Sequence, residues 1–340
     1  MGQKNKIKPV KISHFQRKTI GKVFSLESIG TFIRRESSQA FKYEKKINYF
    51  YSVGLVRRIL DSIIAIFRQG NINHVMGDIH YIATFLNSKK TIITIADCVS
   101  LRRLKGIRQF IIWFFWYYIP VKRAAKIIVI SDFVKNELMA YVTCDPNKIR
   151  VIHVPVLCAV NERKVCQNSD FLNFLHIGST DNKNLQRHVK AIKDIPGILN
   201  FVGEPSPVQL SFLKSNCLNY KIFSNLTNDE IIVLYDSCDL LLFASTYEGF
   251  GMPIIEAQSR GLPVITGNIC SMPEVAGNGA CLVDPYNVCE IKSAVNKVIN
   301  DQVFRENLVR EGFNNILRFK PSLIAEEYDE VYREIINKNS

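Results

Sequence analysis

The chain has 340 residues, 47% of them hydrophobic, so it is long enough for two domains and too apolar to be disordered. Its nine cysteines form no Cys-x-x-Cys pair, which excludes the common zinc and thioredoxin-like spacings and favours a reducing compartment over a disulfide framework. Residues 1–150 hold 27 Lys and Arg against 9 Asp and Glu, whereas residues 151–340 hold 17 against 22. The positive first half is either ordinary solubilising lysine or an attraction for anionic partners such as a membrane leaflet, a lipid pyrophosphate or a nucleic acid.

The amino-terminal segment is basic, with lysines at positions 4, 6, 8 and 11, but no apolar segment follows it. We therefore expect no signal peptide. No stretch of about 18 uninterrupted apolar residues occurs either, so we expect no membrane-spanning helix.

In the first half, short β-rich runs alternate with helical patterns. Leu26, Ile29, Phe32 and Ile33 have helical spacing, and so do the apolar residues between 56 and 64. The expected strands are residues 9–14, 47–51, 74–76, 91–95, 127–130 and 150–154. Such alternation is typical of a parallel α/β domain.

An aromatic run at residues 110–119 contains both tryptophans of the chain and has basic residues on either side. It is too short to span a bilayer. Three interpretations remain open: a helix lying in the membrane interface, an all-apolar helix buried against the sheet, or a mixture with one face in the core and one on lipid.

The second half repeats the alternation after a polar segment, residues 161–169, which we take as the interdomain linker. The expected strands are residues 174–177, 199–202, 221–223, 240–244 and 263–266. The expected helices are residues 228–235, 253–260 and 288–300, with Gly261 as a carboxyl-terminal cap and an amphipathic final segment at 322–337. Doubly wound domains of this kind bind ligands at the carboxyl ends of their strands.

The most informative stretch is residues 245–256, where Glu248 and Glu256 stand eight positions apart with two glycines between them. Pro253 suits the first turn of a helix, whose free N–H groups attract anions. Glycines let the backbone approach a ligand, and carboxylates accept hydrogen bonds from hydroxyls. The combination suits a ligand with a diphosphate and sugars on either side.

A second glycine loop, Gly178-Ser179-Thr180, follows an expected strand, and Lys183 lies just beyond it. This context indicates a phosphate site with a lysine to neutralise the charge. The glycine fingerprint of dinucleotide enzymes and the P-loop pattern are both absent from the sequence, so neither class is indicated.

Residues 245–256 resemble the Glu-x7-Glu motif of family 4 glycosyltransferases, which are retaining enzymes of the GT-B fold. Residues 174–184, 271–277 and 282–285 resemble further segments of that family at its usual spacing. The resemblance is dense over 172–320 and weaker over 72–156. It implies an α/β protein with two Rossmann-like, doubly wound domains facing across a cleft. Residues 1–160 would be a membrane-facing acceptor domain and residues 161–321 a nucleotide-sugar domain, with the terminal helix 322–340 packing back on the first.

The resemblance also implies roles for single residues. Glu256 would bind the nucleotide ribose, and Glu248 would hold the transferred sugar and face the reacting carbon. Gly203 would leave room for the nucleotide base, unless it is a plain glycine at the end of a strand. Glu274 would lie near the same binding site, unless it has an N-cap or turn role. The implied donor-binding set is Gly178, Ser179, Thr180, Lys183, Gly203, Gly249, Phe250, Gly251, Met252 and Glu256.

In the first half, residues 94–97 resemble the family's Thr-Ile-His-Asp segment, but Ala96 replaces the histidine. His80 and Asp97 are our catalytic candidates to compensate, together with Glu248. A lone loop histidine is also often structural. Ser131 begins a further family-like segment, or is a helix N-cap.

The function implied is transfer of a hexosyl unit from a UDP- or GDP-sugar to a hydroxyl of a lipid-linked or lipopolysaccharide-type glycan, in bacterial O-antigen, capsule or lipopolysaccharide synthesis. No Asp-x-Asp triad occurs, so we expect no metal and no cofactor, with Lys183 and helix amides stabilising the leaving group. The protein would lie peripherally on the anionic inner face of the cytoplasmic membrane.

Three alternatives remain open. A nucleotide-sugar epimerase has a similar two-domain fold, although the Glu-x7-Glu region argues against it. The replacement at Ala96 suggests a catalytically degenerate binding subunit. The sequence pI of about 9.3 suggests a nucleic-acid binder, but no zinc-finger, RNP-like or basic-region pattern supports one, and we expect no nucleic-acid partner.

Overall fold

A computed structural model describes residues 9–18, 26–161, 171–216 and 219–339. The chain divides into two compact units: unit 1 comprises residues 1–154 and 321–340, and unit 2 comprises residues 155–320. The basic segment of residues 1–8 lies outside the described residues, and so does the expected linker apart from Asn161.

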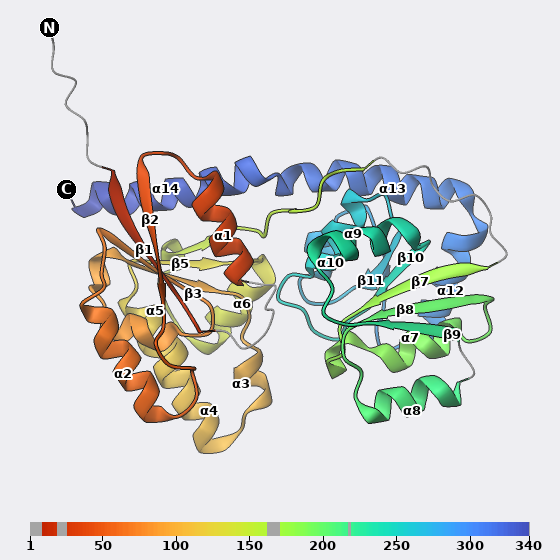
Figure 1. Ribbon diagram of the computed structural model, residues 1–340, viewed down its shortest axis with the longest axis horizontal. Helices are drawn as coiled ribbons and strands as arrows, with labels where there is room; N and C mark the ends of the chain where they lie inside the picture. Colours follow the sequence, from red (N-terminus) through yellow and green to blue (C-terminus); the bar gives the residue numbers. More distant parts are fainter. Residues whose placement is uncertain (1–8, 19–25, 162–170, 217–218, 340) are drawn as a thin grey trace, which may run out of the picture. The chain divides into compact units, whose positions relative to one another are not determined.

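Unit 1 contains a parallel six-stranded sheet in the order β2-β1-β3-β4-β5-β6 (Figure 1). Its strands are β1 (Val10–Gln16), β2 (Phe41–Ile47), β3 (Ile72–Met76), β4 (Thr91–Ile95), β5 (Lys126–Val129) and β6 (Ile149–Val151). Every residue of β3 and β4 is buried, as expected for central strands covered on both faces.

The strand expected at residues 47–51 is wrong, because β2 ends at Ile47 and begins at Phe41. This edge strand is rich in charge, and apolar runs do not reveal it. Glu44 accepts ion pairs from Lys11 at 2.9 Å and from Lys46 at 2.6 Å. Charged side chains are typical of an exposed sheet edge.

The helices of unit 1 are α1 (Leu26–Glu36), α2 (Leu55–Ile66), α3 (Val99–Arg103), α4 (Gly106–Ile112), α5 (Ile119–Arg123), α6 (Asp132–Tyr141) and α14 (Pro321–Asn339). A π-helical segment, Trp113–Tyr118, joins α4 to α5. The last helix, α14, packs on unit 1 through buried Tyr328 and Tyr332. The Tyr332 hydroxyl lies 2.8 Å from His74 Nδ1 on β3, so the end of the chain is tied into the first sheet.

Unit 2 contains a second parallel six-stranded sheet in the order β12-β11-β10-β7-β8-β9. Its strands are β7 (Leu172–Ile177), β8 (Gly197–Val202), β9 (Asn219–Phe223), β10 (Leu240–Phe243), β11 (Val264–Gly267) and β12 (Cys281–Val283). The helices are α7 (Leu185–Ile192), α8 (Pro207–Ser215), α9 (Asn228–Ser237), α10 (Met252–Ser259), α11 (Met272–Ala276), α12 (Val288–Asn300) and α13 (Gln302–Ile316). Only β12, three residues long, has no counterpart among the expected strands.

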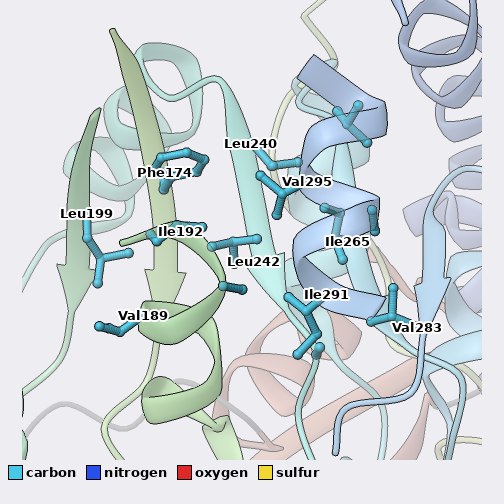
Figure 2. Close-up of a cluster of buried hydrophobic side chains, with 14 of the residues drawn as sticks. Phe174, Val189, Ile192, Leu199, Leu240, Leu242, Ile265, Val283, Ile291 and Val295 are labelled. Carbon is cyan, nitrogen blue, oxygen red and sulfur yellow. The ribbon is translucent and has the colours of Figure 1, made fainter. Parts of the chain in front are cut away.

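The core of unit 2 lies between this sheet and the helices α7 and α12 (Figure 2). Val189 and Ile192 of α7 and Ile291 and Val295 of α12 point toward strand residues such as Leu242. This packing fixes the loops that leave the carboxyl ends of β7 and β10, which are the loops that carry the predicted donor residues.

Candidate functional site

The turn between β10 and α10 carries both motif glutamates. Gly251 precedes α10 with φ 103°, in the left-handed region that favours glycine, and Pro253 lies in the first helical turn. The Phe250 side chain is 4% exposed and its ring stands edge-on to that of Phe319 at 5.8 Å. Phe250 therefore anchors the turn through its buried ring.

Ser271 holds this turn from the neighbouring strand end. Its hydroxyl lies 2.9 Å from the Glu248 carbonyl oxygen and 2.8 Å from that of Phe250. Sequence reasoning noted residues 271–277 only as a family resemblance. The structure gives Ser271 a specific role, because it fixes the backbone from which Glu248 projects.

Helix α10 ends as predicted. Gly261 has φ 65°, its N–H donates to the Gln258 carbonyl, and the Leu262 N–H donates to that of Ala257. These two bonds form a Schellman motif, in which glycine takes the left-handed position.

The loop between β7 and α7 is built closely around Lys183. Gly178 has φ 101°, and a Cβ atom there would come within 2.8 Å of the Lys183 Cγ atom. At the end of β8, Gly203 has φ 139° and a Cβ atom would lie 3.3 Å from the Ser179 nitrogen. Thus glycine at both positions lets adjacent backbone and the lysine stem pack together, beside Ser179 and Thr180.

Two asparagines join this loop to the loop after β10. Asn182 donates from Nδ2 to the Tyr247 carbonyl at 2.9 Å and accepts from the Thr246 N–H at 2.8 Å. Buried Asn184, left-handed at φ 63°, donates to the carbonyls of Ala244 and Pro285 at 2.8 and 2.7 Å. Sequence reasoning missed both roles; the signal was the Lys183-Asn184 pair, because asparagine tolerates left-handed backbone and bonds to carbonyls.

The two loops bring Lys183 and Glu248 into direct contact. Lys183 Nζ donates to Glu248 Oε1 at 2.7 Å, both side chains are mostly buried, and the ammonium lies 4.7 Å from the centre of the Phe243 ring. Partial burial strengthens such a pair relative to one in water. A dianionic group bound here would compete with Glu248 for the lysine.

Glu256 lies one turn into α10 and has a partner that sequence reasoning missed. The Tyr235 hydroxyl of α9, fully buried, donates to Glu256 Oε2 at 2.7 Å. Burial raises the pKa of the Glu256 carboxyl, and the bond from Tyr235 opposes that rise. Tyr235 therefore orients the carboxylate.

Two buried histidines support the first loop from beneath. His176 Nε2–H donates to the Gly178 carbonyl at 3.0 Å, and its Nδ1 lies 2.9 Å from His188 Nδ1. Burial lowers the pKa of both imidazoles, that of His188 to about 4, so both rings are neutral at pH 7.

The catalytic candidates of unit 1 lie at the carboxyl ends of β3 and β4. Buried His80 donates from Nε2 to the Thr94 carbonyl at 3.1 Å, and burial lowers its pKa. Asp97 Oδ1 accepts from the Val99 N–H at 3.0 Å, at the start of α3. Burial raises the pKa of the nearby Asp78 carboxyl and Asp97 adds to the rise, whereas His80, Arg17 and Arg58 oppose it. The sheet end therefore gathers two acids, two arginines and a buried histidine.

Two other sequence interpretations have structural outcomes. Ser131 is the N-cap of α6, since its hydroxyl accepts from the Val134 N–H at 3.2 Å. Glu274 stands inside the first turn of α11, for which Ser271 is the N-cap residue, so Glu274 is not a cap.

The aromatic run at residues 110–119 lies partly in the core, and its membrane contact stays a prediction. Trp116 and Tyr117 are buried, and the rings of Tyr81 and Trp116 are 4.7 Å apart. Phe110 and Phe115 are exposed. The helix thus has one side in the core and one in solvent.

Within the described ranges, no group of three or more His, Cys, Asp or Glu side chains is arranged to hold a metal ion. Across the same ranges, none of the helices combines the length and the apolar character needed to cross a bilayer.

The chain resembles known proteins both in sequence and in fold. Residues 162–315 match the family model described as glycosyl transferases group 1. A serotype-specific mannosyltransferase WbdA of Escherichia coli is 35% identical over 94 residues, which is 28% of this chain but only 12% of WbdA. The O-antigen chain mannosyltransferase RfbU of Salmonella typhimurium is 25% identical over 303 residues, covering 85% of this chain and 82% of RfbU.

Among solved structures, Anabaena HepE in complex with UDP-glucose superposes with a TM-score of 0.77 at 15% identity, covering 96% of this chain and all of that one. At this identity the likeness concerns the fold, which is the GT-B arrangement of two parallel α/β units that the sequence predicted. On their match to the family model, residues 162–315 belong to the glycosyl transferases group 1, the family that the Glu-x7-Glu motif resembles.

Proposed function

We propose that this protein is a retaining hexosyltransferase that uses a nucleotide diphosphate sugar as donor. The observation that carries the proposal is the contact between Lys183 and Glu248 at 2.7 Å, on two loops joined by Asn182 and Asn184. A cation for a diphosphate and a carboxylate for a sugar hydroxyl are adjacent there, as the two neighbouring parts of such a donor require.

The remaining donor contacts follow from the same loops. Glu256, oriented by Tyr235, accepts hydrogen bonds from the ribose hydroxyls, and the backbone of Gly203, beside Ser179, contacts the base. The N–H groups of Gly249 to Met252 lie at the start of α10, where helix amides attract phosphate and sugar oxygens. This arrangement leaves the choice between UDP and GDP to the residues around the base.

The reaction we infer needs few protein groups. The acceptor oxygen bonds to the anomeric carbon as the bond from that carbon to the phosphate oxygen breaks, on the same face, so the configuration is retained. The departing phosphate oxygen takes the acceptor proton. Lys183 and the helix amides stabilise the negative charge that develops there, an effect often worth several kcal/mol. Since the leaving group serves as base, Ala96 in place of histidine is tolerated.

For the acceptor, we propose a hydroxyl of a lipid-linked glycan in bacterial surface polysaccharide synthesis. RfbU, which matches over most of both chains, is named an O-antigen chain mannosyltransferase, and the basic first half suits an anionic acceptor at the inner membrane face. We assign acceptor binding to unit 1, with Asp97 and His80 at the ends of β4 and β3 as the groups nearest to it.

A thermal-shift screen of nucleotide sugars tests the donor. At 100 times its dissociation constant a ligand adds about 2.7 kcal/mol of stability, so the matching donor should stand out from other sugar nucleotides. The transfer step is then tested with that donor, labelled in the sugar, and a lipid-linked acceptor extract. Label in an isomerised free nucleotide sugar would instead indicate an epimerase. Donor binding without turnover of any kind would indicate a degenerate binding subunit.

A further inference from the structure

Helix α2 buries polar side chains and exposes aliphatic ones, the reverse of an ordinary surface helix. Asp61 and Ser62 are 3% and 2% exposed, whereas Leu55 and Val56 are 68% and 70% exposed. Ile59, Leu60 and Ile63 are also exposed, at spacings that place them with Leu55 and Val56 on one face. The polar side of α2 therefore faces the protein and its aliphatic side faces away from it.

This orientation is fixed by specific bonds. Asp61 Oδ1 accepts from the N–H groups of Tyr49 and Phe50 at 3.0 and 3.3 Å, and the Arg58 guanidinium donates to the Ser52 carbonyl at 2.9 Å. Arg58 in turn stacks on the Trp116 ring, 4.5 Å from its centre. Rotating α2 to hide its aliphatic face would break these bonds.

The aliphatic face does not stand alone. Figure 1 shows α2 and α4 at the same end of unit 1, and Ile107 and Phe110 of α4 are exposed as well. We define the apolar surface of unit 1 by Leu55, Val56, Ile59, Leu60 and Ile63 together with Ile107 and Phe110. On α2 the five side chains are neighbours on one helix face, and an exposed apolar patch of this kind marks an interaction surface.

The positive charge of the segments that carry this surface favours an anionic partner. Residues 49–68 and 98–123 contain nine Lys and Arg and a single acid, Asp61, which is buried. A second copy docking on this face through a twofold axis would bring like charges together. An anionic lipid leaflet meets the cations with phosphates and the aliphatic side chains with acyl chains.

We propose that α2 is an interfacial helix, which inserts Leu55, Val56, Ile59, Leu60 and Ile63 into an anionic membrane surface. The choice of a membrane rests on the proposed function, because a lipid-linked acceptor is found there. Arg58, at the inner side of α2, also interacts electrostatically with Asp78 at the end of β3. Insertion of α2 therefore places the acceptor-side residues of unit 1 close to the leaflet.

The test is flotation of the full-length protein with vesicles of phosphatidylcholine, with and without phosphatidylglycerol. The test variant combines Val56→Ser, Ile59→Ser and Ile63→Ser. The matched control combines Val208→Ser, Val233→Ser and Val303→Ser, three valines of unit 2 that are at least 64% exposed. Each methylene group withdrawn from lipid changes the partition about fourfold, and the three substitutions together remove more than three such groups. The test variant should therefore bind phosphatidylglycerol vesicles at least about a hundredfold less, and the control as the wild type does.

Two results would overturn the proposal. One is binding of the test variant equal to that of the wild type. The other is a wild-type dimer in light scattering that the test variant converts to a monomer while vesicle binding stays the same, which would assign the surface to a second copy.

Donor binding separates this proposal from the proposed function. The test variant should keep the donor-induced thermal shift of the wild type, because its substitutions lie in unit 1. If no nucleotide sugar shifts the wild type while vesicle binding follows our expectation, the proposed function fails and the interfacial helix stands.

Discussion

Two amphipathic helices, α7 in unit 2 and α2 in unit 1, carry similar apolar stripes and present them to opposite surroundings. Helix α7 buries Leu185, Val189 and Ile192 in the core, and its Gln186 and Lys190 are exposed. Helix α2 exposes its stripe and buries Asp61 and Ser62. The comparison teaches that helical periodicity identifies an apolar stripe. The contacts of the polar residues opposite the stripe decide whether it packs into the core of the protein or faces solvent or lipid.

The largest effect is expected from a substitution in unit 2 that lowers sugar transfer and leaves membrane binding through unit 1 unchanged. Glu248→Gln removes the carboxylate next to Lys183 and should lower kcat/KM about a thousandfold, because the charge that faces the transferred sugar is lost. Vesicle flotation should not change. Radiolabelled transfer and flotation on the same preparation measure both, and loss of flotation would show that the two regions are not independent.

A smaller loss is expected when Lys183, the cation that we propose for the leaving group, is removed. Lys183→Ala should lower turnover about a hundredfold and leave Glu248 partly buried without its ion pair, whereas Lys183→Arg restores the charge. Steady-state kinetics with both variants provide the measurement. Equal activity of the alanine variant and the wild type would remove Lys183 from the mechanism.

The hydrogen bonds on the buried side of α2 can be removed by a single substitution. Asp61→Ala leaves the Tyr49 and Phe50 N–H groups without their acceptor, which should cost about 2 kcal/mol in the free energy of unfolding. Asp61→Asn keeps an oxygen acceptor and should cost less. Urea denaturation compares the three proteins. If Asp61→Ala is as stable as the wild type, the polar residues do not set the orientation of α2.

The smallest effect concerns pH and Glu256. Folding raises the pKa of this carboxyl above its ordinary value of 4.5, so the folded state binds the proton more tightly than the unfolded state does. Its contribution to stability is full below pH 4.5 and is lost as the pH rises through the higher folded-state pKa. Glu256→Gln should therefore be slightly more stable than the wild type at neutral pH and no different at low pH, while it binds donor more weakly. Melting temperatures across this range measure the difference, and a Glu256→Gln variant that loses stability most at neutral pH would contradict the sign.

The amino-acid sequence already determined the fold class, most strands and the start and end of α10. These depend on short-range chemistry: β-rich runs form buried parallel strands, Pro253 fits a first helical turn and Gly261 takes a left-handed cap. The sequence did not indicate β2, because a charged edge strand has little apolar signal, and it did not indicate the roles of Tyr235 and Ser271.

Those roles were decided by tertiary structure, because each depends on atoms far apart in the chain. Asn182 and Lys183 meet residues 65 positions away only because β7 and β10 are neighbours in the sheet. The direction of α2 is decided in the same way. Its sequence contains one polar and one apolar side, and tertiary contacts, those of Asp61 with the N–H groups of Tyr49 and Phe50 and of Arg58 with Trp116, turn the polar side inward.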